Sequence, residues 1–493
     1  MDQHRTFIII GGGIAGLSAA YYLHKHASQQ PVPFSVHIYE QGQHFGGKIL
    51  TERLDGFVIE GGPDTFVATK PWAVALCHEL GIADSLQGTN PHLKKTYILH
   101  RQRLHTLPGG LTMMIPTKIS PMLTTGLLSW LGKLRMGMDF FISPRREVGD
   151  ESMGEFVSRR IGREAYEHLI EPLMSGIYAG DGDRLSLQAT LPYLRDLELK
   201  HGGLVRGALA VRRARARDGR TVQGSRSLFL TPRGGLAEIV KALLESLRSS
   251  GVGIHSGVAL QHISNPAGGP RLHFSDGSSL RADGVILATP TYAAARLLED
   301  HDPLLAAELA GIEYVSTATV SMAFREDQLA RPLDGYGYVI PRREERKALA
   351  CTWTSSKFPH RAPVGHALLR VFIGRAGQQD DIVWNEKDLI ALAMEELAST
   401  LGIQAQPLLT RVHIFEDAMP QYNLGHPERL EKIENRLQRW PWLALAGGGY
   451  RGIGIPDCIH SGERAAQRLL DQGPEAAQHD THIHNLSTIG ASA

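Results

Sequence analysis

Three glycines near the N-terminus have the spacing of a phosphate-binding turn. Gly11, Gly13 and Gly16 follow an apolar run at 7–10 that reads as a buried strand, and they open a helical segment at 14–25. In a Gly-x-Gly-x-x-Gly pattern the first glycine makes a tight turn, the second lets the backbone approach a pyrophosphate, and the third lets the helix pack against the strand. Free N–H groups and the helix dipole favour an anion at that helix start. The sequence therefore predicts a dinucleotide-binding βαβ unit.

The second predicted strand, 34–40, ends in an acid, Glu40, which is placed to accept a hydrogen bond from a ribose hydroxyl. An acid there disfavours the 2′-phosphate of NADP but does not separate NAD from FAD. Two glycine segments that follow bear on this choice: Gly46-Gly47-Lys48, and the run DGFVIEGGP at 55–63. Glycines without side chains let the backbone approach a bound ligand closely.

A glycine-rich block near the C-terminus is the most specific motif. It reads AGGGYRGIGIPDCI at 446–459 and is followed by Ser461-Gly462. Together with the two glycine segments, it closely resembles the FAD-dependent porphyrinogen oxidases of haem biosynthesis, within the FAD-linked amine-oxidase superfamily. Two further passages, EPLMSGIYAGD at 171–181 and LTPRGGL at 230–236, resemble the same family. The resemblance extends from about residue 6 to about residue 470.

The resemblance implies FAD as the cofactor. A backbone N–H at a helix start would stabilise negative charge on the flavin as it is reduced, and the C-terminal block would provide that start. The residues that we expect to contact FAD are Gly11, Gly13, Ile14, Ala15, Gly16, Glu40, Gly46, Gly47, Lys48, Gly61, Gly62, Pro63, Val258, Gly452, Gly454 and Ile455.

The implied reaction is the six-electron oxidation of a porphyrinogen to a porphyrin, in three two-electron steps with O2 as acceptor and hydrogen peroxide as product. The mean hydropathy of −0.15 and the lack of a spanning segment favour coproporphyrinogen III as substrate. Protoporphyrinogen IX is the alternative. Two more distant interpretations share the same scaffold. The first is a flavin amine oxidase or carotenoid desaturase, and the second is a non-enzymatic escort protein for prenylated partners. The Pro-Asp-Cys block disfavours the former and the intact Gly11, Gly13, Gly16 and Glu40 set disfavours the latter.

Three residues are candidates for substrate contact in a large apolar cleft edged by cations. Gly176 could offer its carbonyl to pyrrole N–H groups, Tyr336 could stack on the macrocycle, and Lys95 could pair with a propionate. Each has a simpler interpretation: a structural turn, a core aromatic residue and a solvated lysine.

Composition excludes several classes of protein. The 493 residues are 42% hydrophobic and carry a net charge of +1, so general disorder and a nucleic-acid partner are not expected. The three cysteines are far apart, so we expect neither disulfides nor a metal site, and we expect a cytoplasmic protein. Dimerisation is left open.

The order of elements predicts an α/β (α+β) fold, in which a Rossmann-like FAD-binding domain carries an inserted helical domain and an inserted antiparallel-sheet substrate domain. An apolar region at 111–143 would form the cleft entrance or contact a membrane surface, and the arginine-rich 206–233 would be an exposed loop. The predicted divisions are 1–89, 206–299 and 426–472 for FAD binding, 90–205 helical, 300–425 for substrate, and 473–493 a disordered tail.

Overall fold

The structure is a computed structural model that describes residues 4–109, 111–112, 115–116, 119–146, 149–217, 227–265 and 269–471. The predicted tail at 473–493 lies outside the described residues, as does 218–226 of the predicted basic loop.

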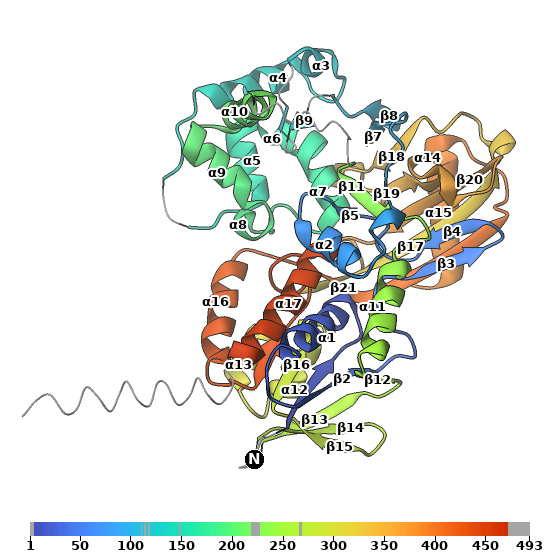
Figure 1. The fold of residues 1–493 in the computed structure, drawn as a ribbon. Helices are drawn as coiled ribbons and strands as arrows, with labels where there is room; N and C mark the ends of the chain where they lie inside the picture. The colour runs from blue at the N-terminus through green and yellow to red at the C-terminus, as the bar shows by residue number, and fades with distance from the viewer. Residues whose placement is uncertain are drawn as a thin grey trace, which may run out of the picture.

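A five-stranded parallel sheet forms the lower part of the molecule (Figure 1). Its order is β12 (Gly253–Ser256), β2 (Phe34–Glu40), β1 (Arg5–Ile10), β16 (Gly284–Leu287) and β22 (Leu443–Leu445). Alternate residues of β1 point to opposite faces: Phe7 and Ile9 join one buried cluster, and Ile8 and Ile10 join another. A central parallel strand must be apolar on both faces, which explains the unbroken Phe-Ile-Ile-Ile run.

Helices cover both faces of this sheet. One face carries α1 (Ile14–Ala27), α2 (Pro71–Glu79), α11 (Ala237–Ser249) and α17 (Ile455–Asp471). The other carries α12 (Thr291–Leu298), α13 (Pro303–Ala310), α16 (His426–Leu437) and the small sheet β13 (Leu260–Ser264), β14 (Arg271–Phe274) and β15 (Ser279–Arg281). Strands from three distant parts of the chain thus build one dinucleotide-type domain.

A seven-stranded sheet lies to the right in Figure 1 and is covered by α15 (Glu386–Leu401). Its order is β21 (Leu409–Pro420), β17 (Tyr314–Arg325), β20 (His366–Ile373), β19 (Ala348–Trp353), β18 (Gly335–Val339), β7 (Lys95–His100) and β8 (Arg103–Thr106). We expected 90–205 to be helical, but β7 and β8 extend this sheet. The buried Ile98 and Leu99 of β7 find their core there, and β7 pairs in parallel with β18.

The helical region stands at the upper left of Figure 1. It comprises α3 (Ile119–Thr124), α4 (Trp130–Gly137), η2 (Met138–Phe140), α5 (Met153–Ile161), α6 (Arg163–Ala165), the π-helix η3 (Tyr166–Ile170), α7 (Glu171–Tyr178), α8 (Leu187–Thr190), α9 (Pro192–His201) and α10 (Leu204–Arg217). The prediction of a loop from 206 onward is wrong for 206–217, because Leu204 and Ala208 bury an apolar face of α10 in the helical core.

Short elements connect these three parts. They are the pair β3 (Thr51–Leu54) and β4 (Phe57–Glu60), the sheet β5 (Phe66–Val67), β11 (Phe229–Pro232) and β6 (Leu86–Gly88), the pair β9 (Leu111–Thr112) and β10 (Ile115–Pro116), α14 (Thr354–Lys357), and the turns η1 (Ala83–Ser85), η4 (Glu326–Gln328), η5 (Arg342–Glu344) and η6 (Pro359–Arg361). Within the described ranges, no helix is long and apolar enough to cross a membrane.

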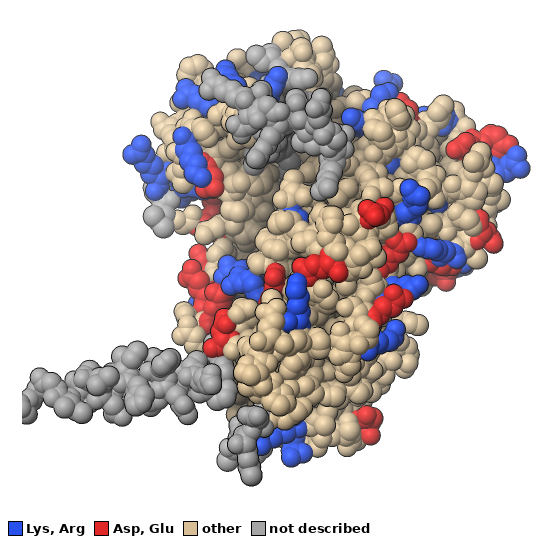
Figure 2. Space-filling view, viewed as in Figure 1, with Lys and Arg blue, Asp and Glu red and all other residues tan. Residues whose placement is uncertain are grey.

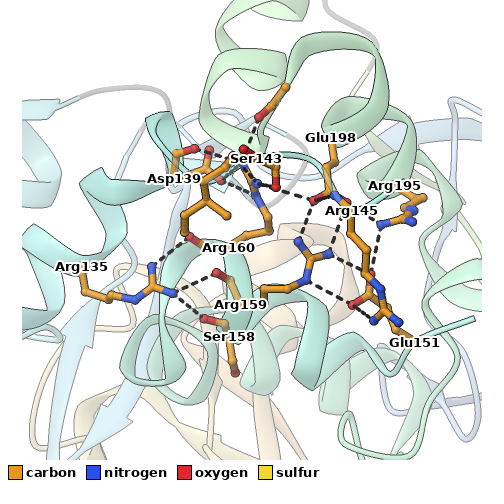
Figure 3. Close-up of polar contacts among 12 residues, drawn as sticks. Arg135, Asp139, Ser143, Arg145, Glu151, Ser158, Arg159, Arg160, Arg195 and Glu198 are labelled. Carbon is orange, nitrogen blue, oxygen red and sulfur yellow. Dashed lines mark hydrogen bonds and ion pairs between the residues drawn. The ribbon is translucent and has the colours of Figure 1, made fainter. Parts of the chain in front are cut away.

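A network of buried ions holds the helical region together (Figure 3). Arg160 and Asp139 are fully buried and pair at 2.6 Å. Glu198, also without exposed side-chain surface, accepts hydrogen bonds from Arg159 and Arg195. Because each buried charge has a partner, the network ties η2, α5 and α9 into one body.

Candidate flavin and substrate site

The turn between β1 and α1 has the geometry that the three-glycine pattern predicts. Gly11 has φ +107°, and a Cβ on it would lie 2.6 Å from the carbonyl oxygen of Ala288. A Cβ on Gly16 would lie 1.9 Å from the carbonyl oxygen of Gly11. A Cβ on Gly13 would meet no protein atom within 4 Å. Gly11 and Gly16 are therefore required by the fold, whereas Gly13 keeps an open side at the start of α1.

A second glycine turn lies directly on the first. Gly13 and Gly46 form a parallel β-bridge, and the Gly46 N–H donates to the Gly12 carbonyl at 2.8 Å. Gly47 has φ +59°, and a Cβ on it would come within 3.1 Å of the Gly13 Cα. The two turns thus form a continuous glycine surface beside the open side of Gly13.

Glu40 at the end of β2 ties several of these segments together. Its two carboxylate oxygens accept hydrogen bonds from the N–H groups of Gly12 at 2.6 Å and Gly42 at 2.8 Å. Its carbonyl accepts from the N–H of Val258 at 3.0 Å, which brings that predicted contact residue to the same place. A carboxylate oxygen has further lone pairs, so these bonds leave Glu40 able to accept from a ribose.

Lys48 connects the glycine turns to β21 and lies beside Cys458 of the C-terminal block. Its ammonium donates to the Ala418 carbonyl, and its own carbonyl lies 1.9 Å from where a Gly62 Cβ would be. The side chain keeps accessible surface, whereas burial among protein atoms lowers the pKa of the ammonium. The neighbouring Cys458 thiol has its pKa raised by burial to about 12, so it stays protonated.

The C-terminal block ends at the helix start that we predicted. The helix α17 begins at Ile455, and Gly452, with φ +126°, makes the turn before it. The hydroxyl of Tyr422 donates to the Gly448 carbonyl at 2.6 Å and accepts from the Gly452 N–H at 2.8 Å. Asp457, in the first turn of α17, pairs with Lys70 at 2.6 Å. The loop is therefore braced by side chains on both sides.

The first and last helices of the described residues, α1 and α17, pack against each other. A Cβ on Gly462 would lie 2.3 Å from the Ala15 carbonyl oxygen, so the two helices make close backbone contact. Ile14 and Ala15 are buried in this core. Their side chains support the phosphate turn from below, and any contact with the dinucleotide would come from their backbone.

The segment 60–62 is held from the seven-stranded sheet. Arg370 donates to the carbonyl oxygens of Glu60 and Gly62, and Thr319 donates to that of Gly61. Pro63 follows in the chain. Sequence reasoning missed Arg370 and Thr319 because they lie on strands about three hundred residues away, with no motif around them.

The three substrate candidates lie along β18, with Lys95 and Tyr336 at its start and Gly176 at its end. Lys95 on β7 is in register with Gly335, next to Tyr336, and Gly176 lies 3.7 Å from the Val339 side chain, measured from a Cβ built on it. Gly176 is exposed in the last turn of α7, where carbonyl groups lack the usual helical partners.

The other two candidates already have partners. The Tyr336 hydroxyl donates to the Asn90 carbonyl at 2.7 Å, and the Lys95 ammonium pairs with Asp334 at 2.7 Å. Asp334 raises the pKa of Lys95, which stays charged. Both simpler interpretations, a packed aromatic residue and a surface lysine, therefore fit these contacts as well as substrate roles do.

The end of α7 is joined to the C-terminal block. Gln421 donates to the Tyr178 carbonyl at 3.0 Å, and the Tyr178 ring lies 6.2 Å from that of Tyr422. Tyr422 is the residue that braces Gly448 and Gly452. The helix that carries Gly176 thus reaches the block that the resemblance assigns to the flavin.

Comparison with known proteins identifies the family. The family of flavin-containing amine oxidoreductases matches residues 14–470. The chain belongs to this family. Its open Gly13, the adjoining Gly46–Gly47 turn and the helix start at Ile455 fit an FAD that lies along them. The predicted family, fold class and FAD cofactor are confirmed, and the protein is a flavin-dependent oxidoreductase.

Relatives match the chain over nearly its full length. It is 36% identical over 470 residues to the coproporphyrinogen III oxidase of Bacillus subtilis (strain 168), covering 95% of this chain and 98% of that protein. It is 31% identical over 490 residues to the protoporphyrinogen oxidase of Bos taurus, covering 96% and 100%.

Solved structures share the fold. A provisionally assigned protoporphyrinogen oxidase from Exiguobacterium sp. 255-15 superposes with a TM-score of 0.83 at 33% identity, covering 94% of this chain and 98% of that chain. A UDP-galactopyranose mutase, with a TM-score of 0.68 at 17% identity over 95% of this chain and 96% of that one, shares the fold alone.

Proposed function

We propose that this protein oxidises coproporphyrinogen III to coproporphyrin III, with FAD as cofactor and O2 as electron acceptor. The observation that carries the proposal is the C-terminal block, whose Gly452 turn and helix start at Ile455 are braced by Tyr422, beside the end of α7. The full-length match to coproporphyrinogen III oxidases at 36% and 34% identity supports this substrate over protoporphyrinogen IX.

The residues of the chain would hold and orient the cofactor. A bound FAD would supply the hydride-acceptor chemistry, with oxygen as the final acceptor and hydrogen peroxide as its product. Gly13 leaves room for the pyrophosphate, and Glu40 accepts from the ribose. The N–H groups at the start of α17 favour negative charge where the helix begins. Lys48 adds a cation near the same place, which acts in the same direction.

The substrate would lie where α7 meets the β7–β18 strand pair. The exposed carbonyl of Gly176 would accept from pyrrole N–H groups, and Tyr336 would contact the macrocycle. Lys95 would bind a propionate by exchanging its partner Asp334 for the substrate carboxylate. Acidic and basic side chains are interspersed over the face seen in Figure 2.

A steady-state comparison of the two porphyrinogens tests the proposal. The purified, FAD-loaded protein should form hydrogen peroxide and a fluorescent porphyrin from coproporphyrinogen III, with a higher kcat/KM than from protoporphyrinogen IX. A higher kcat/KM for protoporphyrinogen IX would mean that protoporphyrinogen IX, and not coproporphyrinogen III, is the substrate. No peroxide with either compound would overturn it.

Substitution at Lys95 tests the propionate contact. Lys95→Met should raise KM for coproporphyrinogen III while leaving kcat near the wild-type value, because a propionate contact far from the reacting carbon is made equally in ground and transition states. Asp334→Asn is the matched control, since it removes the competing partner and should lower KM. An unchanged KM in both variants would mean that Lys95 is a solvated surface lysine that does not contact the substrate.

We also propose that α4 contacts an anionic membrane surface. The exposed fractions of Trp130, Leu131, Leu134 and Phe141 are 72%, 78%, 69% and 85%. Two cations lie near these side chains: the Lys133 ammonium is 4.5 Å from the centre of the Trp130 ring, and the Arg206 guanidinium carbon is 5.7 Å from the centre of the Phe140 ring. Exposed apolar side chains flanked by cations are typical of a peripheral binding surface.

Vesicle sedimentation tests this contact. The protein should bind vesicles that contain phosphatidylglycerol, and Trp130→Gln/Leu134→Gln should weaken that binding at least fivefold. Leu304→Gln/Val383→Gln removes two equally exposed apolar residues elsewhere and serves as the control. Equal binding by both double variants would overturn the contact. The cytoplasmic location and dimerisation stay predictions.

A further inference from the structure

Three consecutive peptide carbonyls before Pro63 are fixed by buried side chains of the seven-stranded sheet. Arg370 on β20 donates to the Glu60 carbonyl at 2.9 Å and to the Gly62 carbonyl at 2.8 Å. Thr319 on β17 donates to the Gly61 carbonyl at 2.6 Å. The arginine side chain is 4% exposed and Thr319 is 5% exposed. Such a complete set of donors leaves this segment little freedom to move relative to the sheet.

The fixed segment adjoins the glycine surface of the dinucleotide site. A Cβ on Gly62 would lie 1.9 Å from the Lys48 carbonyl oxygen, and a Cβ on Gly47 would lie 3.1 Å from the Gly13 Cα. A trans peptide points its N–H away from its C=O, and the described residues include no cis peptide. The Gly61–Gly62 peptide therefore points its N–H away from Thr319, with its dipole held in a set direction.

Arg370 also belongs to a buried cluster with more positive than negative charge. Arg361 pairs with Glu60 at 2.6 Å, and Asp64 lies 3.1 Å from Lys357 and 3.5 Å from Arg370. These are three cations against two carboxylates, an excess of one positive charge. Burial alone would raise the pKa of Asp64, but Lys357 and Arg370 outweigh it and hold that pKa well below the usual range. Both carboxylates are thus already neutralised, and the excess charge is available to a neighbouring anion.

We propose that Arg370 is a positioning residue that raises the reduction potential of the bound flavin. It orients the 60–62 backbone, and it supplies a buried positive charge that favours the reduced, anionic form of the cofactor over the neutral oxidised form. This inference rests on the proposed flavin chemistry, but it concerns the potential of the cofactor and not the identity of the substrate. In this way an inserted substrate domain would set a property of the cofactor in another domain.

The test is the two-electron midpoint potential of the FAD-loaded full-length protein, measured anaerobically against a reference dye. Arg370→Gln should shift the reduction equilibrium at least tenfold toward oxidised flavin, which is a drop of about 30 mV. Arg370→Lys keeps the charge and should recover at least half of that shift. Thr319→Val removes one carbonyl donor with little change of volume, and it should retain FAD with a smaller shift than Arg370→Gln.

Arg375→Gln is the matched control. Arg375 is also a buried arginine, 1% exposed, and it also donates to two carbonyls, but these belong to Ile340 and Ala348 and not to the 60–62 segment. The midpoint potential of the flavin in Arg375→Gln should equal that of the wild type.

Two results would overturn the inference: an unchanged potential in Arg370→Gln with stoichiometric FAD, or an equal shift in Arg375→Gln. If Arg370→Gln fails to fold, Thr319→Val carries the test, and a wild-type potential in FAD-loaded Thr319→Val would overturn the inference. Porphyrinogen turnover by the wild type is measured separately, so failure of the proposed function would be recognised independently.

Discussion

Replacement of Gly13 and of Gly16 by alanine separates a ligand-facing glycine from a structural one. Gly13 has φ −70° and ψ 176°, which alanine adopts freely, and its added methyl group would meet no protein atom within 4 Å. The free energy of unfolding of FAD-free Gly13→Ala should therefore lie within about 0.5 kcal/mol of wild type, or rise by up to about 1 kcal/mol because the unfolded chain loses entropy.

FAD binding should respond in the opposite way. If the open side of Gly13 receives the pyrophosphate, the methyl group displaces it and costs at least one hydrogen bond to a charged group, about 1.5–3 kcal/mol. That corresponds to FAD binding weaker by roughly ten- to a hundredfold. Gly16→Ala is the comparison: its Cβ would lie 1.9 Å from the Gly11 carbonyl oxygen, so the FAD-free fold itself should lose roughly 1–3 kcal/mol or more.

Urea unfolding of the FAD-free proteins and titration with FAD, followed by flavin fluorescence, measure the two quantities separately. Wild-type affinity for FAD in Gly13→Ala would refute the assignment of this turn to the pyrophosphate. Equal loss of FAD-free stability in both variants would refute the reasoning from open and filled space.

Three further predictions concern stability. Arg160→Met leaves the buried Asp139 carboxylate without its ion-pair partner and should cost about 3–5 kcal/mol in urea unfolding. Arg163→Met removes exposed ion pairs to Glu167 and Asp183 and should cost about 1 kcal/mol or less per pair. Equal costs would contradict the importance of burial. Tyr422→Phe removes the hydroxyl that bridges Gly448 and Gly452, and it should lower the free energy of unfolding by about 1–3 kcal/mol. FAD titration should also show weaker binding, and wild-type affinity for FAD would mean that this loop does not contact the cofactor. Burial lowers the pKa of His426 to about 4, so its stabilising contribution is present above the unfolded pKa near 6.5 and is lost as pH falls toward 4. His426→Gln should remove this loss of about 3 kcal/mol from the pH dependence of the free energy of unfolding. An unchanged pH dependence would mean that other groups cause the loss of stability in acid.

Much of the dinucleotide site could be predicted from sequence, because its requirements are local. Gly11 needs a positive φ, Gly16 needs the absence of a side chain, and strand 34–40 was predicted with the bounds observed for β2. The helix start at Ile455 also follows from the glycines directly before it. Each of these signals lies within a few residues of the feature that it specifies.

Pairing partners could not be predicted in the same way. Lys95 has the expected charge, but only the sheet places it against Asp334, and only the helical core makes 204–217 a helix instead of an exposed loop. The range predicted to be helical contains β7 and β8, because nothing in their sequence indicates that β7 pairs with β18. Burial decides such cases, and burial depends on the whole fold.

The sequence by itself predicted a phosphate turn, since glycine requirements and strand–turn–helix order are encoded in contiguous residues, and its resemblance to a known family implied the cofactor. Only the tertiary structure decided what holds the 60–62 segment in place: Arg370 and Thr319 reach it from strands that are distant in the chain. Local conformational preferences act over a few residues, whereas the partner of a buried charge or carbonyl is chosen by which surfaces come together when the chain folds.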